Sequence, residues 1–163
     1  MEATAKLIER NQAYAADFDR GGLAAPPALK IAIVTCMDAR LHAASAFGLE
    51  LGDAHVIRNA GGVVTDDVIR SLAISQHHLG TTEVMVVHHT QCGMLTFTDE
   101  EFAQALERET GQRPAWESRT FKDLEQDVRD GVQMIRESPF LPHTDNVRGF
   151  VYDVATGEVH EVS

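Results

Sequence analysis

The chain has 163 residues, a length typical of one domain that can bury its own hydrophobic core. Hydrophobic residues at 44% and charged residues at 24% are ordinary for a globular protein. The formal charge of −11 argues against nucleic-acid binding and against docking on an anionic membrane, because both surfaces attract clustered lysine and arginine.

The first half of the chain predicts an isolated helix and then an alternation of strands and helices. Apolar residues recur at helical spacing over residues 3–19, and a linker rich in glycine and proline follows. We interpret residues 1–25 as a helical arm and linker that packs on its own core or on a partner subunit. The next expected elements are a strand at 31–35, a short helix at 40–48, a strand at 55–58 and a helix between a Thr65 cap and Gly80.

The second half continues the same alternation. Its expected elements are a buried strand at 84–87, a helix at 99–109 that begins with a Thr98–Glu101 capping box, a helix at 121–135, a strand at 147–154 and a short strand ending at 162. Alternating strands and helices predict right-handed crossovers and an α/β fold. With no repeat or low-complexity segment, we expect residues 1–163 to form a single catalytic domain.

Two short motifs hold both cysteines of the chain, and each directly follows a predicted strand. Cys36-Met-Asp-Ala-Arg40 follows the strand at 31–35, and His89-Thr-Gln-Cys92-Gly93 follows the strand at 84–87. Parallel sheets bind ligands beyond the carboxyl ends of their strands, so both motifs are expected at one crevice. The loop at 59–62 leaves its strand at the same end.

The residue types of the two motifs predict a zinc site. Two thiolates and an imidazole, from Cys36, Cys92 and His89, are ligands that zinc takes, and they leave a fourth tetrahedral position. An open position admits water, which zinc converts to a nucleophilic hydroxide near neutral pH. Asp38 is the alternative fourth ligand, unless a charge-assisted pair with Arg40 holds its carboxylate away from the metal.

Less specific interpretations exist for each residue taken alone. A cysteine at a strand end is often a buried small residue, and an isolated His-x-x-Cys pair arises by chance. His88 adjoins His89, but successive strand side chains point to opposite faces, and the spacing to Cys92 favours His89 as the ligand. Two cysteines in a chain with an acidic residue at position 2 and no signal peptide predict a reducing, cytoplasmic location.

With these two motifs the sequence resembles the β-class carbonic anhydrases, in particular their small bacterial and archaeal branch. The resemblance extends from about residue 30 to residue 95 and includes the segments 57–61 and 67–71. It implies a parallel four-stranded core sheet with flanking helices and added C-terminal edge strands. It also implies a homodimer, in some members a tetramer, with the amino-terminal helix on the partner subunit.

The resemblance implies a reaction and a role for each motif residue. Cys36, His89 and Cys92 would bind Zn²⁺, and Asp38 with Arg40 would form a catalytic pair that gates the fourth position. The expected reaction is hydration of carbon dioxide to bicarbonate and a proton by metal-bound hydroxide. The alternatives are hydrolysis of carbonyl sulfide or carbon disulfide at the same site, and a zinc-binding or thiol redox module without turnover. His88 departs from the glycine common in the family before the ligand histidine.

Overall fold

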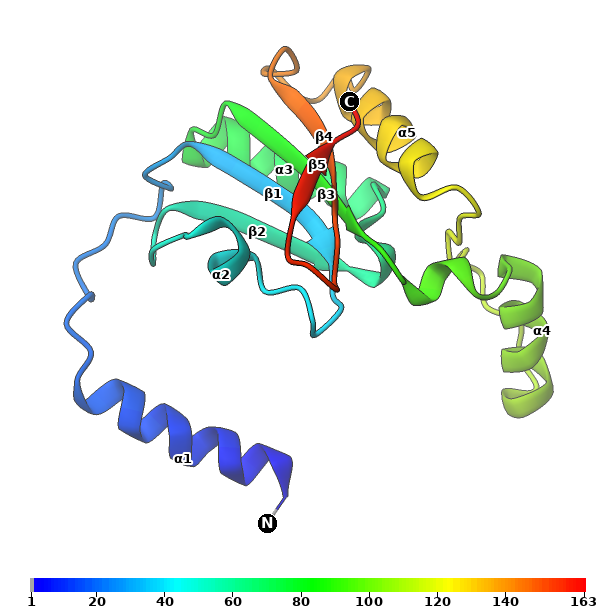
Figure 1. Ribbon diagram of the computed structural model, residues 1–163, viewed down its shortest axis with the longest axis horizontal. Helices are drawn as coiled ribbons and strands as arrows, with labels where there is room; N and C mark the ends of the chain where they lie inside the picture. The colour runs from blue at the N-terminus through cyan, green and yellow to red at the C-terminus, as the bar shows by residue number, and fades with distance from the viewer. Residues whose placement is uncertain (1) are drawn as a thin grey trace.

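Five strands form one sheet in the order β2-β1-β3-β4-β5 in the computed structural model, which describes residues 2–163 (Figure 1). The first four strands are parallel and β5 is antiparallel to β4. This confirms the predicted parallel core with a C-terminal edge strand. The strand bounds are β1 Ile31–Cys36, β2 Ala54–Asn59, β3 Glu83–His89, β4 Val147–Tyr152 and β5 Val159–Glu161.

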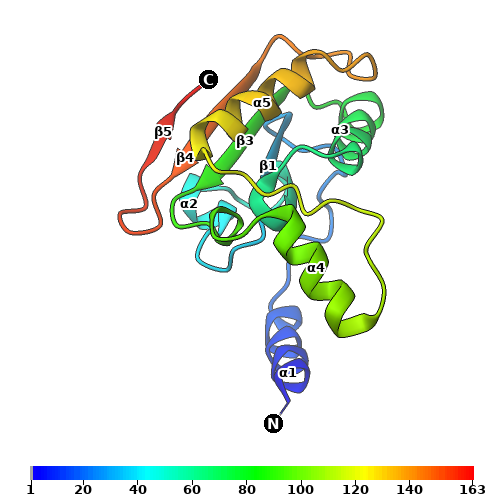
Figure 2. The same cartoon turned by 90° about the vertical axis from the view of Figure 1, so that its right-hand side faces the viewer.

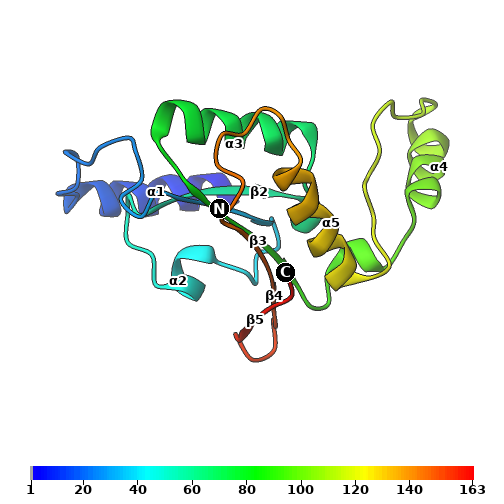
Figure 3. The same ribbon diagram turned by 90° about the horizontal axis from the view of Figure 1, so that it is seen from above.

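Helices cover the two faces of the sheet unequally. The longer helices α3 (Asp66–Leu79) and α5 (Leu124–Arg136) pack on one face, and the five-residue α2 (Ala43–Phe47) lies on the other (Figure 3). On the α5 face, Gly149 of β4 lets the helix approach closely, since an added Cβ would lie 2.5 Å from the side chain of Val128. The main core therefore lies between β1, β3, β4 and the α3–α5 layer.

Side-chain caps set several helix ends, and two of them correct the predicted bounds. Thr65 caps α3, and Thr98 forms the expected capping box at α4 (Asp99–Thr110). The predicted helix at 121–135 instead begins at Leu124, because Asp123 accepts a hydrogen bond from the next turn and acts as its N-cap. In the same way His42 caps α2, so the predicted helix at 40–48 begins three residues later.

Two helices have no buried residue in the single chain. The amino-terminal α1 (Ala3–Ala16) ends three residues earlier than predicted and lies apart from the sheet (Figures 1 and 2). Helix α4 projects from the opposite side of the domain (Figures 1 and 3). Within residues 2–163, no helix has both the length and the apolar character needed to span a membrane.

Candidate metal centre and its cavity

The two cysteine motifs meet at the carboxyl ends of β1 and β3. Cys36 is the last residue of β1, His89 is the last of β3, and Cys92 follows three residues later. The two strands are parallel neighbours, so their carboxyl ends lie side by side. The Sγ atoms of both cysteines and a ring nitrogen of His89 all lie within 4.8 Å of one another, and the three residues are buried.

The histidine is prepared to donate a lone pair. His89 Nδ1 lies 2.9 Å from the carbonyl oxygen of Thr90, which fixes the ring proton on that nitrogen. His89 Nε2 is buried and, within the described residues, has no hydrogen-bond partner. A buried nitrogen without a partner is costly in a folded protein, whereas a metal ion would satisfy it. With two sulfur donors beside it, this ligand set fits zinc.

Contact between the two thiols shifts their pKa values in opposite directions. A hydrogen bond from Cys92 lowers the pKa of Cys36 to about 4, although burial opposes this shift. The same contact and burial raise the pKa of Cys92. Burial opposes the charged form of His89, but the nearby Cys36 sulfur and the Thr90 carbonyl oxygen outweigh burial and raise its pKa. Metal uptake must therefore displace a proton from Cys92, so affinity for a metal should increase with pH.

Asp38 and Arg40 form a two-point ion pair beside this group. Arg40 donates from Nε to Asp38 Oδ1 at 3.0 Å and from its terminal nitrogen to Oδ2 at 2.8 Å. Hydrogen bonding by Arg40 holds the pKa of Asp38 well below its usual range, so the carboxylate stays ionised. Asp38 Oδ2 lies 3.7 Å from His89 Nε2. The carboxylate thus borders the Cys36–His89–Cys92 group while Arg40 engages both its oxygens.

Arg40 also joins the two motifs to each other. Its terminal nitrogen donates to the carbonyl oxygen of Gln91 at 3.1 Å, across 51 residues of sequence. Gln91 has a φ of 56°, a left-handed conformation that is uncommon for a residue with a side chain. Such backbone strain is typical of functional loops. This contact could not be predicted from the sequence, because it depends on a main-chain atom.

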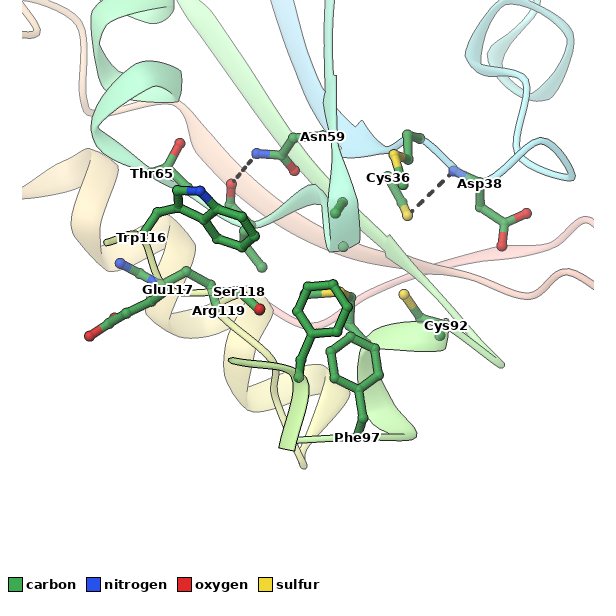
Figure 4. A pocket seen from close by; sticks show the side chains of 17 residues that line it. Cys36, Asp38, Asn59, Thr65, Cys92, Phe97, Trp116, Glu117, Ser118 and Arg119 are labelled. Atoms are coloured by element: carbon green, nitrogen blue, oxygen red, sulfur yellow. Dashed lines mark hydrogen bonds between the residues drawn. The ribbon is translucent and has the colours of Figure 1, made fainter. Parts of the chain in front are cut away.

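A cavity of about 600 Å³ opens beside the metal centre (Figure 4). Cys36, Asp38 and Cys92 lie at one end, and Trp116 and Arg119 lie at the other. Most of its surface is apolar, supplied by the side chains of Val63, Met94, Phe97, Phe102 and Trp116. The shape and polarity suit a small uncharged molecule approaching the metal centre.

The loop after β2 forms part of this cavity because glycine allows it to approach β1. Gly62 has a φ of 72°, and a Cβ atom added there would lie 2.8 Å from the backbone nitrogen of Cys36. Gly61 lines the cavity. The loop at 59–62 is therefore both a tight turn and a cavity wall, and it lies at the end of the sheet where the sequence places it.

His88 lies on the face of the sheet opposite to His89. Its Nε2 lies 2.7 Å from Asp127 Oδ2 on α5, and its ring stacks on Phe121 at 5.2 Å between centroids. The structure thus brings together Cys36, His89 and Cys92 with the Asp38–Arg40 pair, and leaves His88 in the packing between sheet and helix. Strand alternation separates the two histidines.

Comparison with known proteins places the chain in a family. A family model described as carbonic anhydrase matches residues 31–159. The chain belongs to the β-carbonic anhydrase family. It is 52% identical to β-carbonic anhydrase 1 of Mycobacterium tuberculosis over 163 residues, which cover 100% of this chain and 99% of that protein.

Two further relatives show the range of the β-carbonic anhydrase family. The structure of carbonic anhydrase from Streptococcus mutans superposes with a TM-score of 0.94 at 47% identity, covering 100% of this chain and 99% of that one. Carbon disulfide hydrolase of an Acidianus species is 35% identical over 149 residues, which cover 76% of this chain and 72% of that protein. Membership in the family therefore leaves more than one substrate class to weigh.

We predict that the purified protein binds about one zinc ion per chain, since structural and catalytic zinc sites take such sulfur and nitrogen ligands. Cys36→Ser and Cys92→Ser should each lose the metal, as measured by elemental analysis after gel filtration. His78→Ala, which removes an exposed histidine on α3, is the matched control and should keep it. Full zinc content in the Cys36→Ser, Cys92→Ser double variant would contradict this ligand assignment.

Proposed function

We propose that the protein catalyses the reversible hydration of carbon dioxide to bicarbonate and a proton, with Zn²⁺ held by Cys36, His89 and Cys92. The observation that carries this proposal is the buried two-sulfur, one-nitrogen group at the end of an apolar cavity, with the Asp38–Arg40 pair at its edge. The 52% identity to a β-carbonic anhydrase over the whole chain supports it.

Each group has a separate task in this reaction. Zinc, when bound, supplies an acidified water as the nucleophile. Asp38, beside the metal-binding group, would accept a hydrogen bond from the nucleophile and orient it; its lowered pKa makes it an acceptor and not a carrier of the released proton. Arg40 occupies both carboxylate oxygens and so keeps Asp38 from becoming a ligand itself.

The cavity suits the uncharged substrate. Carbon dioxide has no net charge and loses little hydration on entering an apolar space, whereas bicarbonate is an anion. The walls formed by Phe97, Phe102 and Trp116 therefore favour entry of the gas. The product forms next to Arg40, whose half-exposed guanidinium faces solvent and can attract the anion outward.

A second candidate function is hydrolysis of carbon disulfide or carbonyl sulfide at the same site. The 35% identity to a protein named carbon disulfide hydrolase supports this second reaction. A zinc-binding or redox module without turnover is less well supported, because such a module needs no oriented nucleophile and therefore no Asp38–Arg40 pair.

The free, buried thiols of both cysteines support a reducing, cytoplasmic compartment.

We also propose a homodimer, and in some conditions a tetramer, in which the arm at residues 1–25 packs on a second copy of the chain. Helix α1 exposes Leu7, Ile8 and Tyr14, each more than half accessible in the single chain. Large apolar side chains gathered on one helix usually mark an interface. The linker at 17–30 carries the helix away from its own sheet, which supports a contact with another subunit (Figure 1).

Turnover of the zinc-loaded protein tests the main function. We expect rapid hydration of carbon dioxide in a stopped-flow pH-indicator assay, and much slower sulfide release from carbonyl sulfide and carbon disulfide. The opposite order of rates would establish the second candidate function. Zinc binding with no turnover of any of the three substrates would establish the non-catalytic module.

Variants of the ion pair test the proposed mechanism. Arg40→Ala should free Asp38 to enter the fourth ligand position, and Asp38→Ala should remove the acceptor that orients the nucleophile. Each should lower kcat/KM by about 10- to 100-fold with zinc content near that of the parent. The control Arg70→Ala breaks an exposed ion pair with Asp67. Such surface pairs contribute little to the free energy of unfolding. Parent-like activity in both site variants would show that the pair is structural.

Charge introduced on α1 tests the proposed dimer. Tyr14→Glu places a carboxylate on the apolar side of the helix, and should shift the protein toward monomers in sedimentation velocity experiments. Ala13→Glu, on the side of the same helix away from Leu7 and Ile8, adds the same charge and should leave the assembly unchanged. A variant without residues 2–25 should dissociate or aggregate. A truncated protein that remained dimeric would exclude this role for the arm.

A further inference from the structure

Arg58, on the edge strand β2, makes an unusual set of contacts with the loop that carries Cys36 and Asp38. Its Nε donates to the carbonyl oxygen of Cys36 at 2.9 Å. One terminal nitrogen donates to the carbonyl oxygens of Asp38 at 2.7 Å and of Leu41 at 2.9 Å. One side chain thus binds the beginning, middle and end of the segment 36–41.

Other bonds also hold this segment: Arg40 binds the Asp38 carboxylate and the Gln91 carbonyl oxygen, and two main-chain bonds add to these. The backbone nitrogen of Met37 donates to the carbonyl oxygen of Asn59 at 2.8 Å. The backbone nitrogen of Leu41 donates to the carbonyl oxygen of Asp38 at 3.1 Å. Within residues 2–163, no other side chain donates to the carbonyls of Cys36, Asp38 or Leu41. Carbonyl groups outside a strand or helix need other hydrogen-bond partners, and one guanidinium is the side-chain partner of all three of these.

The charge of Arg58 remains uncompensated. No carboxylate in the described part of the chain lies within ion-pair distance of its guanidinium, unlike Arg40, which is paired with Asp38. All three of its hydrogen bonds go to main-chain oxygens. The guanidinium is therefore committed to the main chain of the loop that carries Cys36 and Asp38.

We propose that Arg58 is a positioning residue, which holds the segment 36–41 so that the Cys36 thiol and the Asp38–Arg40 pair have the geometry for metal binding and turnover. The inference rests on the zinc-dependent function proposed above. Its physical basis is the fork of the guanidinium, which reaches three acceptors in fixed directions. A lysine at this position would keep the charge but could not reproduce that fork.

The test compares Arg58→Gln and Arg58→Lys with the control Arg70→Gln. The first readout is the rate at which zinc passes from the loaded protein to an excess of chelator. Both Arg58 variants should release zinc about 10- to 100-fold faster than the parent, as expected when a contact that orients a ligand is lost. The zinc-release rate of the control should stay within about twofold of the parent rate, because the exposed ion pair of Arg70 contributes little to stability.

The second readout separates positioning from general destabilisation. Amide hydrogen exchange in the metal-free proteins should accelerate over residues 36–42 in both Arg58 variants and remain unchanged over β4 at 147–152. Equal acceleration in both segments would overturn the proposal in favour of a general loss of stability. If Arg58→Gln does not fold, Arg58→Lys decides the matter by the same two readouts.

Two results would overturn the inference directly. Parent-like zinc release and exchange in Arg58→Gln would show that the three hydrogen bonds do not position the loop. Full restoration by Arg58→Lys would assign the effect to charge and not to the fork. A parent that binds zinc without hydrating carbon dioxide would overturn the proposed function alone, because neither readout depends on turnover.

Discussion

The metal centre depends on the parallel pairing of β1 with β3. Since the two strands are neighbours and run in the same direction, their carboxyl ends meet, and residues separated by more than 50 positions become a single ligand group. Buried valines and isoleucine hold both strands between two layers of side chains. The strand pairing thus brings the two sulfurs and the imidazole together before any metal binds, which lowers the entropy cost of forming the site.

Two arginines then organise the charges around this group in different ways. Arg40 binds the Asp38 carboxylate and the Gln91 carbonyl, so it links the loop after β1 to the loop after β3. Arg58 binds only carbonyl oxygens, at three points along the loop after β1. Residues around a metal site orient its ligands. Arg40 orients the Asp38 side chain, and Arg58 orients the main chain that carries Cys36 and Asp38, so the two sets of contacts complement each other.

Much of the fold and the central residues of the site could be predicted from the sequence, because their signals are local. Apolar runs, caps and the two cysteine motifs gave the parallel sheet and the candidate ligands, and strand alternation separated His88 from His89. The contacts of Arg58 and the left-handed backbone of Gln91 could not be predicted, because both depend on main-chain atoms distant in sequence. Helix ends shifted where His42 and Asp123 serve as caps, a role that apolar periodicity does not reveal.

The exposed elements connect the cavity with the assembly of the protein. Phe102 on α4 and Trp116 in the loop after it line the cavity, yet both rings are partly open to solvent in the single chain. Phe97 contacts Phe102 at 5.4 Å between centroids, so the exposed rings continue directly into the buried wall beside Cys92. A subunit that covered these rings would therefore narrow the cavity mouth as well. In that arrangement, the surface buried by assembly and the path of the substrate would be set by the same side chains.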